Sequence, residues 1–115
     1  MLLVRTEVRP SAIHGQGLFA AQSIRKGQDV WRFEPRVDQI SAVASGHFSW
    51  RTEYGYVTPG DDAKFINHSK TPNLWTMPGM APVCAARDIE AGEELTESYA
   101  DYDLDWPTYA ATLEP

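Results

Sequence analysis

At 115 residues the chain has the length of one domain, because single hydrophobic cores usually occupy about 100 to 200 residues. Its net charge of −6 argues against direct nucleic-acid binding, which normally requires a basic face to displace counterions from phosphates. One cysteine, Cys84, excludes an internal disulfide and a cysteine-rich zinc site.

The N-terminal segment MLLVRTEVRP has an apolar run too short for a signal peptide, and no run of about 18 apolar residues follows. We therefore expect no membrane insertion and, as the default compartment, the cytoplasm.

The acidic charge is concentrated near the C-terminus. Residues 1–86 hold nine Lys/Arg and seven Asp/Glu, whereas residues 87–115 hold Arg87 against nine acids. Two interpretations stay open: the acidic end attracts a basic partner, or it is a solvated end that aids solubility.

Short apolar stretches separated by turn residues predict a mainly β protein. Strands are expected near residues 2–8, 17–21, 29–33, 54–57, 82–86 and 94–99.

Two short helices are also expected. The first is a short helix or a helical turn after Pro35, where apolar residues recur at helical spacing before a glycine: Val37, Ile40 and Val43 or Ala44, before Gly46. The second follows Pro107, which suits a first helical turn, with Asp105 as its cap.

Two segments resemble each other. FAAQSIRKGQDV from Phe19 and CAARDIEAGEEL from Cys84 align at a constant offset of 65 (84 minus 19). Each copy predicts a strand, a tight turn at Gly27 or Gly92, and a second strand. Two copies are too few for a solenoid and indicate a compact β domain.

Three motifs could carry chemistry. In HGQGLFA, Gly15 and Gly17 flank Gln16 and allow a sharp turn or a close approach to a ligand. The motif lacks the third glycine of a dinucleotide site and the Lys-Ser/Thr of a phosphate loop, so a simple turn before a strand is the alternative.

In FINHSKTPN, Asn67 and His68 could read the edge of a heterocycle such as adenine, or could simply cap turns. His68 has no second His or Cys at metal-ligand spacing, so no metal site is expected. In GEELTESYADYD, alternation places Leu95, Glu97 and Tyr99 on one face of a strand. Tyr99 is either a site residue or a core residue with its hydroxyl at the surface.

In this order the three motifs resemble the SET-domain family of protein lysine methyltransferases, over about residues 5–103. The resemblance implies a SET-domain, β-clip-like fold of several short strands and small sheets, with one or two short helices. It also implies a C-terminal pseudoknot, an exception to the rule against threading. The expected organisation is a single domain over residues 1–115, with a motif core at 5–103 and a lid at 104–115.

The resemblance further implies S-adenosylmethionine as cofactor, bound by Gly15, Gln16 and Gly17 and by Asn67 and His68. It places Tyr99 where the lysine amine meets the methyl group, as the catalytic residue.

Other positions are implied around the lysine. Phe33, Trp75 or Thr76, and Tyr102 are candidates for the substrate channel, although the spacing of Tyr102 need not place it there. Trp106 could stack on adenine or be an ordinary core or surface aromatic.

The sequence departs from the family pattern in three places. Lys70 stands where many members have a zinc-binding Cys, and the tail has none. Ser98 stands where the family often has Asp. A lid must therefore come from tail residues such as Leu104, Trp106 and Tyr109, or from a second subunit in a homodimer.

The leading hypothesis is an enzyme that methylates a lysine in a basic context of a protein or peptide, in the cytoplasm or, if it acts on chromatin, in the nucleus. The alternatives are a SET-fold module that binds cofactor or a basic peptide with little or no turnover, and a small β-clip protein of unrelated function. The substrate and the number of methyl groups added are beyond the sequence.

Overall fold

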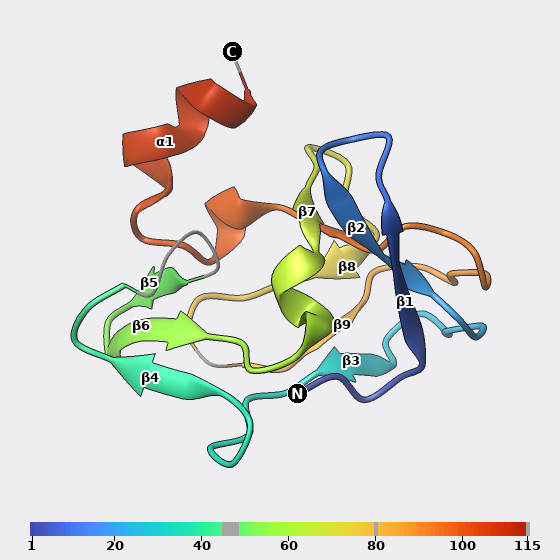
Figure 1. Cartoon of the computed structure of the whole chain (residues 1–115), viewed down its shortest axis with the longest axis horizontal. Helices are drawn as coiled ribbons and strands as arrows, with labels where there is room; N and C mark the ends of the chain where they lie inside the picture. The colour runs from blue at the N-terminus through green and yellow to red at the C-terminus, as the bar shows by residue number, and fades with distance from the viewer. Residues whose placement is uncertain (45–48, 80, 115) are drawn as a thin grey trace.

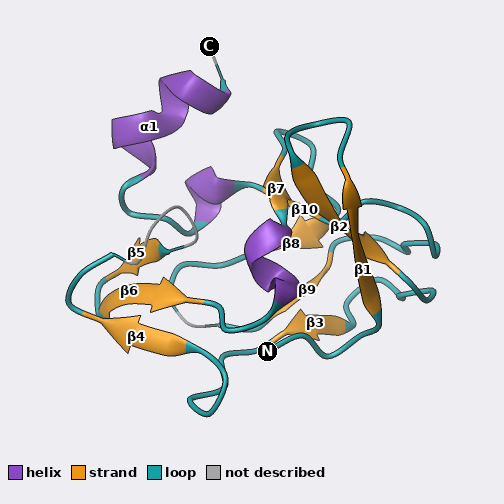
Figure 2. Cartoon of the chain, viewed as in Figure 1, coloured by secondary structure: helices purple, strands orange, loops and turns teal. Residues whose placement is uncertain are grey.

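The computed structural model describes residues 1–44, 49–79 and 81–114 and has four small sheets, two 3-10 turns and one α-helix (Figures 1 and 2). The elements are β1 (Thr6–Pro10), β2 (Gln16–Ala20), β3 (Asp29–Trp31), β4 (Gln39–Ser41), β5 (Trp50–Thr52), β6 (Gly55–Thr58), η2 (Asp62–Phe65), β7 (Asn67–His68), β8 (Leu74–Trp75), β9 (Val83–Ala85), β10 (Thr96–Glu97), η3 (Tyr99–Asp101) and α1 (Trp106–Leu113).

Three of the sheets are antiparallel and one is parallel. β1 pairs with β2, β4–β6–β5 and β3–β9–β8 form three-stranded sheets, and β7 pairs in parallel with β10. The β1–β2 hairpin lies at one end of the molecule and β4–β6–β5 at the other, with η2 between them (Figure 1). The expected mainly β fold is confirmed.

Each of the six expected strands overlaps an observed one, and four of the observed strands, β1, β3, β9 and β10, are shorter than expected. The segment 94–99 is the clearest case, because β10 ends at Glu97 and Tyr99 begins a 3-10 turn. Strands β4, β5, β7 and β8 were not expected, because they are only two or three residues long and carry no clear alternation of apolar residues.

The short helix expected after Pro35 is wrong, and only a single turn forms there, in which the Asp38 amide donates to the Glu34 carbonyl at 2.7 Å. Residues 39–41 form β4, in which Ile40 pairs with Val57 of β6. The preceding turn is held by the buried carboxylate of Asp38, which accepts hydrogen bonds from the amides of Glu34 and Gly60 at 2.9 Å. Sheet pairing therefore overrides the helical spacing. Gly46, the expected stop, lies outside the described residues.

The helix expected after Pro107 is confirmed as α1, and Asp105 occupies its N-cap position. Its side chain makes no capping bond. It accepts instead from the Tyr56 hydroxyl at 2.9 Å and from Arg51 at 3.0 Å, which fastens the start of α1 to β5 and β6.

The two similar segments pair with each other. Ile24 and Ile89 exchange two backbone hydrogen bonds of 2.8 Å. Two equivalent bonds of 2.7 Å join the copies through a glycine and an alanine: Gly27 N to Ala85 O, and Gly92 N to Ala20 O. Both glycines have positive φ (85° and 95°), which only glycine adopts at little cost. The predicted strand-turn-strand unit is confirmed, and the copies are related by a local two-fold arrangement.

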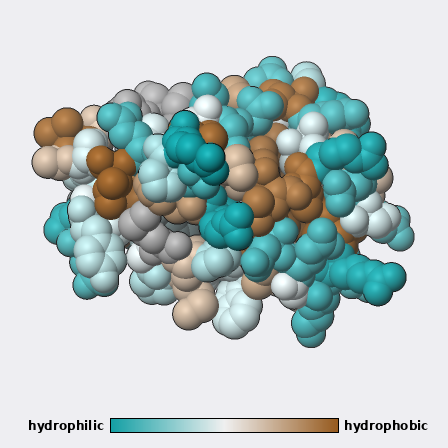
Figure 3. Space-filling model, turned by 90° about the horizontal axis from the view of Figure 1, so that it is seen from below, coloured by the Kyte–Doolittle hydropathy of each residue, from teal (hydrophilic) through white to brown (hydrophobic). Residues whose placement is uncertain are grey.

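The core lies where these units meet the other sheets. Its largest fully buried side chains are Leu18, Ile24, Val30, Val57, Leu74, Ile89 and Leu95. Burying each of them contributes about 1.5–3 kcal/mol. Seen from below, apolar residues reach the surface in separate groups between hydrophilic ones (Figure 3).

The acidic C-terminal region is largely used inside the fold. Most of its nine carboxylates accept internal hydrogen bonds or form ion pairs: Asp88, Glu93, Glu94, Glu97, Asp103, Asp105 and Glu114. These seven carboxylates therefore have partners within the fold, and both interpretations of the acidic end stay predictions. Among the described residues, no helix has the length and apolar character needed to cross a bilayer.

Candidate active site

The site is organised by the pairing of β7 with β10. Thr96 pairs with Asn67 and Glu97 with His68, and the Ser69 amide donates to the Glu97 carbonyl at 2.9 Å. The pairing brings Tyr99 beside His68 despite 30 intervening residues, and it is the contact that the implied pseudoknot requires.

The side chain of Asn67 fastens the glycine-rich segment to β7. Its amide nitrogen lies 3.0 Å from the His14 carbonyl, 3.2 Å from the Gln16 carbonyl, 3.0 Å from a Glu94 carboxylate oxygen and 3.2 Å from the Ser11 hydroxyl. One NH₂ group has two hydrogens, so these acceptors share them. Asn67 thereby sets the position of residues 14–16.

Gly15 and Gly17 disfavour other residues for different physical reasons. A Cβ at Gly17 would lie 2.4 Å from a Glu94 carboxylate oxygen, so the carboxylate occupies the space that a side chain would need. Gly15 has open space at its Cβ position but a φ of +47°, which disfavours other residues. Gly15 and Gln16 are exposed, and their carbonyls accept hydrogen bonds from the Ser11 amide at 2.8 Å and from the Asn67 side chain at 3.2 Å.

His68 lies between Tyr99 and the C-terminal helix. Its Nδ1 accepts a hydrogen bond from the Tyr99 amide at 3.1 Å, which leaves the ring proton on Nε2, facing Glu114. The Trp106 ring packs over the imidazole, with centroids 4.6 Å apart and planes inclined by 34°. Helix α1 therefore covers the His68 side chain, although Leu104, another expected lid residue, is exposed.

These groups fit an adenosyl cofactor. They combine an exposed glycine-rich turn with the half-buried ring of Trp106, on which a heterocycle can stack, whereas the His68 ring is itself covered by Trp106. The residues expected to bind the cofactor thus come from three segments, 15–17, 67–68 and α1, that the fold brings to one side.

The hydroxyl of Tyr99 donates a hydrogen bond of 2.5 Å to the Ile66 carbonyl. Burial, with a contribution from Glu97, raises the pKa of Tyr99 above its ordinary value. The phenol therefore remains protonated and can act only as a neutral group near neutral pH. Tyr102 packs edge-on against it with ring centroids 6.0 Å apart, and burial raises the pKa of Tyr102 as well.

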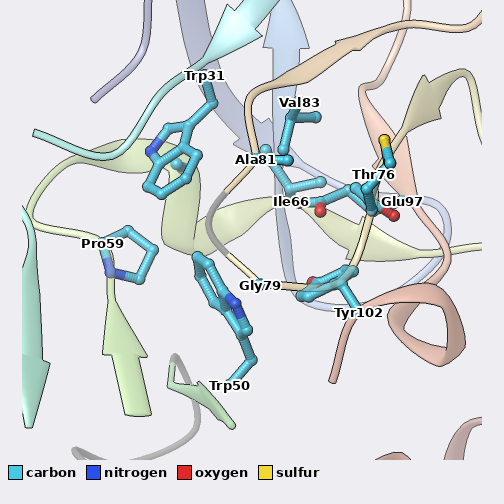
Figure 4. Close-up of a pocket in the computed structure, with 12 residues that line it drawn as sticks. Trp31, Trp50, Pro59, Ile66, Thr76, Gly79, Ala81, Val83, Glu97 and Tyr102 are labelled. Atoms are coloured by element: carbon cyan, nitrogen blue, oxygen red, sulfur yellow. The ribbon is translucent and has the colours of Figure 1, made fainter. Parts of the chain in front are cut away.

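Two adjoining cavities lie beside these tyrosines. The first is lined by Trp31, Trp50, Pro59, Ala63, Ile66, Thr76, Met77, Gly79, Ala81, Val83, Glu97 and Tyr102. The second is lined by Ser49, Trp50, Pro59, Ala63, Lys64, Ile66, Glu97, Tyr99, Tyr102, Asp103 and Tyr109. Figure 4 shows Trp31, Trp50 and Pro59 on one side of the first cavity and Thr76, Glu97 and Tyr102 on the other. Glu97 and Tyr102 line both cavities.

Polar atoms without partners gather at the first cavity. Within the described part of the chain, the buried side-chain nitrogen and oxygen atoms that lack a hydrogen-bond partner are Trp31 Nε1, Trp50 Nε1 and Thr76 Oγ1. All three residues line this cavity. Because buried polar groups are normally paired, their clustering indicates a place where a ligand supplies the missing partners.

Only some of the residues expected to form the substrate channel line a cavity. Thr76 is buried and lines the first cavity together with Tyr102. Trp75 is 59% exposed on β8, and Phe33 packs against Trp31, so among the described residues neither belongs to the cavity walls.

Most of the cavity residues were not expected as site residues, and three of these could contribute to binding: Trp31, Trp50 and Glu97. Trp31 lay within a predicted strand and Trp50 in a segment without a motif, so neither carried a local signal. Glu97 did carry one, since it alternates with Leu95 and Tyr99 and is an acid on the apolar face of a strand.

Comparison with known proteins identifies the family. The SET-domain family model matches residues 15–100. A Plasmodium falciparum (isolate 3D7) protein named "Putative histone-lysine N-methyltransferase 1" is 26% identical over 117 residues, which cover 84% of this chain and 2% of that protein.

Solved structures agree in fold. KRYPTONITE, in a complex with DNA, an H3(1–15) peptide and SAH, superposes with a TM-score of 0.64 at 25% identity, over 90% of this chain and 25% of that chain. The methyltransferase domain of human histone-lysine N-methyltransferase SETMAR superposes with a TM-score of 0.61 at 23% identity, over 85% of this chain and 45% of that chain. The chain thus spans a small part of the relatives' length. With three motifs in order, the paired β7 and β10 and a family match over most of its length, the chain belongs to the SET-domain family.

Proposed function

We propose that this chain is an S-adenosylmethionine-dependent methyltransferase that transfers a methyl group to the side-chain amine of lysine in a protein. The observation that carries the proposal is the buried, protonated hydroxyl of Tyr99, held on the Ile66 carbonyl at the wall of a cavity with aromatic sides. Membership of the SET family supports it and removes the interpretation as an unrelated β protein.

The cofactor would be held by the backbone of Gly15, Gln16 and Gly17, by Asn67 and His68, and by Trp106. When bound, S-adenosylmethionine supplies a methyl group on a sulfonium, which a neutral amine can attack. The chain's part is to fix the loop through Asn67 and to exclude water with α1, whose Trp106 already covers His68.

The lysine must lose its charge to react. Its amine has a pKa of about 10.4 in water, so near neutral pH almost every molecule is protonated and has no free electron pair. An apolar cavity disfavours the ammonium and lowers its pKa. Tyr99 would then orient the neutral amine, because its hydroxyl and the Ile66 carbonyl are held in one geometry.

The substrate we propose is a protein or peptide with an accessible lysine in a basic context, of the histone type seen with KRYPTONITE, whose complex contains an H3(1–15) peptide. Residues 1–115 would act as one SET unit, with a core over 5–103 and a lid over 104–115, in the cytoplasm or the nucleus. A homodimer would complete the lid if α1 alone does not; sedimentation at increasing concentration tests this.

The experiment combines binding with transfer. Purified protein should be thermally stabilised by S-adenosylmethionine, since a ligand bound to the native state raises apparent stability. It should also transfer labelled methyl to a lysine-rich peptide panel.

Tyr99→Phe should abolish most of the transfer and leave cofactor affinity within about twofold, because the ring remains and only the orienting hydroxyl is lost. An unchanged rate would show that another residue orients the amine. Cofactor binding without methyl transfer across the panel would support a binding module. Absence of cofactor binding would refute both the enzyme and the cofactor-binding module.

A further inference from the structure

The carboxyl group of Glu97 is buried in the wall that the two cavities share. It accepts a hydrogen bond from Tyr102. Within the described residues it has no ion-pair partner among the salt bridges of the structure. A buried carboxylate without a cation is costly, so the group either keeps its proton or receives a cation from a ligand.

The groups that face Glu97 come from several elements. Thr76 follows β8, Tyr99 lies in η3 and Tyr102 follows it. Lys64 of η2 also lines the second cavity, with its ammonium 5.4 Å from the centre of the Phe65 ring. Asp103 and Tyr109 also line the second cavity, but Asp103 is committed: it accepts from the Tyr109 hydroxyl at 2.5 Å and from the Arg51 amide at 3.0 Å. Glu97 is therefore the acid whose charge is available to a ligand.

The walls around Glu97 suit an organic cation. Trp31 and Trp50 pack edge-on at 5.6 Å, and Trp50 and Tyr102 at 5.4 Å, so three aromatic rings border the cavity. Aromatic faces attract ammonium groups, and Thr76 Oγ1 adds an oxygen without a partner. An acid, an unpaired hydroxyl and aromatic walls together match the head group of a lysine.

We propose that Glu97 is a catalytic residue that pairs with the ammonium of the incoming lysine and takes one of its protons, so that the amine is presented to Tyr99 as a neutral nucleophile. This inference rests on the proposed function and adds a group to it that the family motifs do not contain.

Burial raises the pKa of Glu97 to about 8, so the empty cavity holds a neutral carboxyl near pH 7. When the ammonium enters, the carboxyl releases its proton to solvent and becomes the counter-ion. One N–H bond of the ammonium then breaks, its electron pair stays on nitrogen, and the proton forms an O–H bond on Glu97. An apolar cavity favours the resulting neutral amine and neutral acid over the ion pair.

The advantage can be estimated from the two pKa values. At pH 7 about one lysine amine in 2,500 is neutral in water, because its pKa is about 10.4. About one Glu97 in ten is ionised at that pH if its pKa is about 8. At pH 7 the combination of ionised Glu97 and lysine ammonium, which holds the same number of protons as the neutral pair, is therefore about 250-fold more populated than neutral lysine alone, and this ratio is the upper bound of the gain.

The test compares the wild type, Glu97→Gln and a control, Asp101→Asn, which removes one acid from the exposed part of η3. We expect Glu97→Gln to lower kcat/KM between about tenfold and 250-fold at pH 7, with cofactor affinity within twofold and Asp101→Asn unchanged. In the wild type kcat/KM should level off near pH 8. In Glu97→Gln it should keep rising to about pH 10, where the two profiles meet because lysine loses its proton in solution.

A binding arm separates this inference from the proposed function. A lysine peptide and its norleucine analogue, which lacks the amine, are titrated into each variant with S-adenosylhomocysteine present. The wild type should prefer the lysine peptide, and Glu97→Gln should lose at least tenfold of that preference. Glu97→Leu, which also lacks the charge, repeats the test if Glu97→Gln folds poorly.

Equal kcat/KM and equal peptide preference in the wild type and Glu97→Gln would overturn the role of Glu97 while leaving methyl transfer intact. If the wild type binds the lysine peptide selectively but transfers no methyl, the proposed activity fails and the Glu97 counter-ion stands. Loss of the lysine preference in Asp101→Asn as well would also overturn the inference, because net charge alone would explain it.

Discussion

Replacing Asn67 with alanine removes the amide that joins β7 to the glycine-rich segment. Its two N–H groups are shared among four acceptors, of which the Glu94 carboxylate is charged. A bond to a neutral acceptor contributes about 1 kcal/mol and one to a charged acceptor about 2 kcal/mol, so the loss is about 3 kcal/mol. For a chain of 115 residues, this corresponds to a fall in Tm of about 12 °C.

The same change should weaken S-adenosylmethionine binding by about tenfold, because residues 14–16 lose the bonds that fix their backbone. Asn73→Ala is a matched control. Asn73 is buried, donates to the Glu94 carbonyl at 2.8 Å and accepts from the Thr96 amide at 2.9 Å, but does not contact the loop.

Thermal unfolding and cofactor titration should show similar stability losses in the two variants and lost affinity in Asn67→Ala alone. Equal loss of affinity in both would refute the reasoning, since binding would then follow global stability.

Three further outcomes are expected. Gly17→Ala should push the Glu94 carboxylate from its place, cost about 1–3 kcal/mol in urea unfolding and weaken cofactor binding; unchanged values would mean that Glu94 moves freely. Trp106→Ala should reduce cofactor affinity by up to about tenfold and speed proteolysis of α1, because the ring contact with His68 is lost; full protection of the tail would contradict this. Finally, Glu97 keeps its proton up to about pH 8 in the folded state, whereas it releases the proton near pH 4.5 in the unfolded chain. The free energy of unfolding should therefore fall as the pH rises from about 4.5 to about 8. Glu97→Gln should flatten that slope and be up to a few kcal/mol more stable than the wild type at pH 8; parallel stability profiles would show that Glu97 is not protonated in the fold.

The repeated segments show which structural features can be predicted from local sequence and which cannot. Gly27 and Gly92 could be predicted as turns because positive φ favours glycine, and both have it. That the copies pair with each other through Ile24 and Ile89 did not follow, because similarity in sequence does not specify which strands meet. The failed helix after Pro35 has the same cause, since the partner of Ile40 is Val57 of a later strand.

The sequence by itself determined the family, the mainly β class and the C-terminal helix, and it predicted candidate site residues that include Asn67, His68 and Tyr99. These depend on local properties: turn glycines, a helix-starting proline and three motifs in a fixed order. Only the tertiary structure decided what those residues touch. It showed Asn67 fastened to a loop more than 50 positions away, Thr76 in a cavity wall and Trp75 outside it, and Glu97 buried beside Trp50. Cavities form where distant segments pack together, so their walls, and the pKa of an acid within them, depend on contacts that no local pattern encodes.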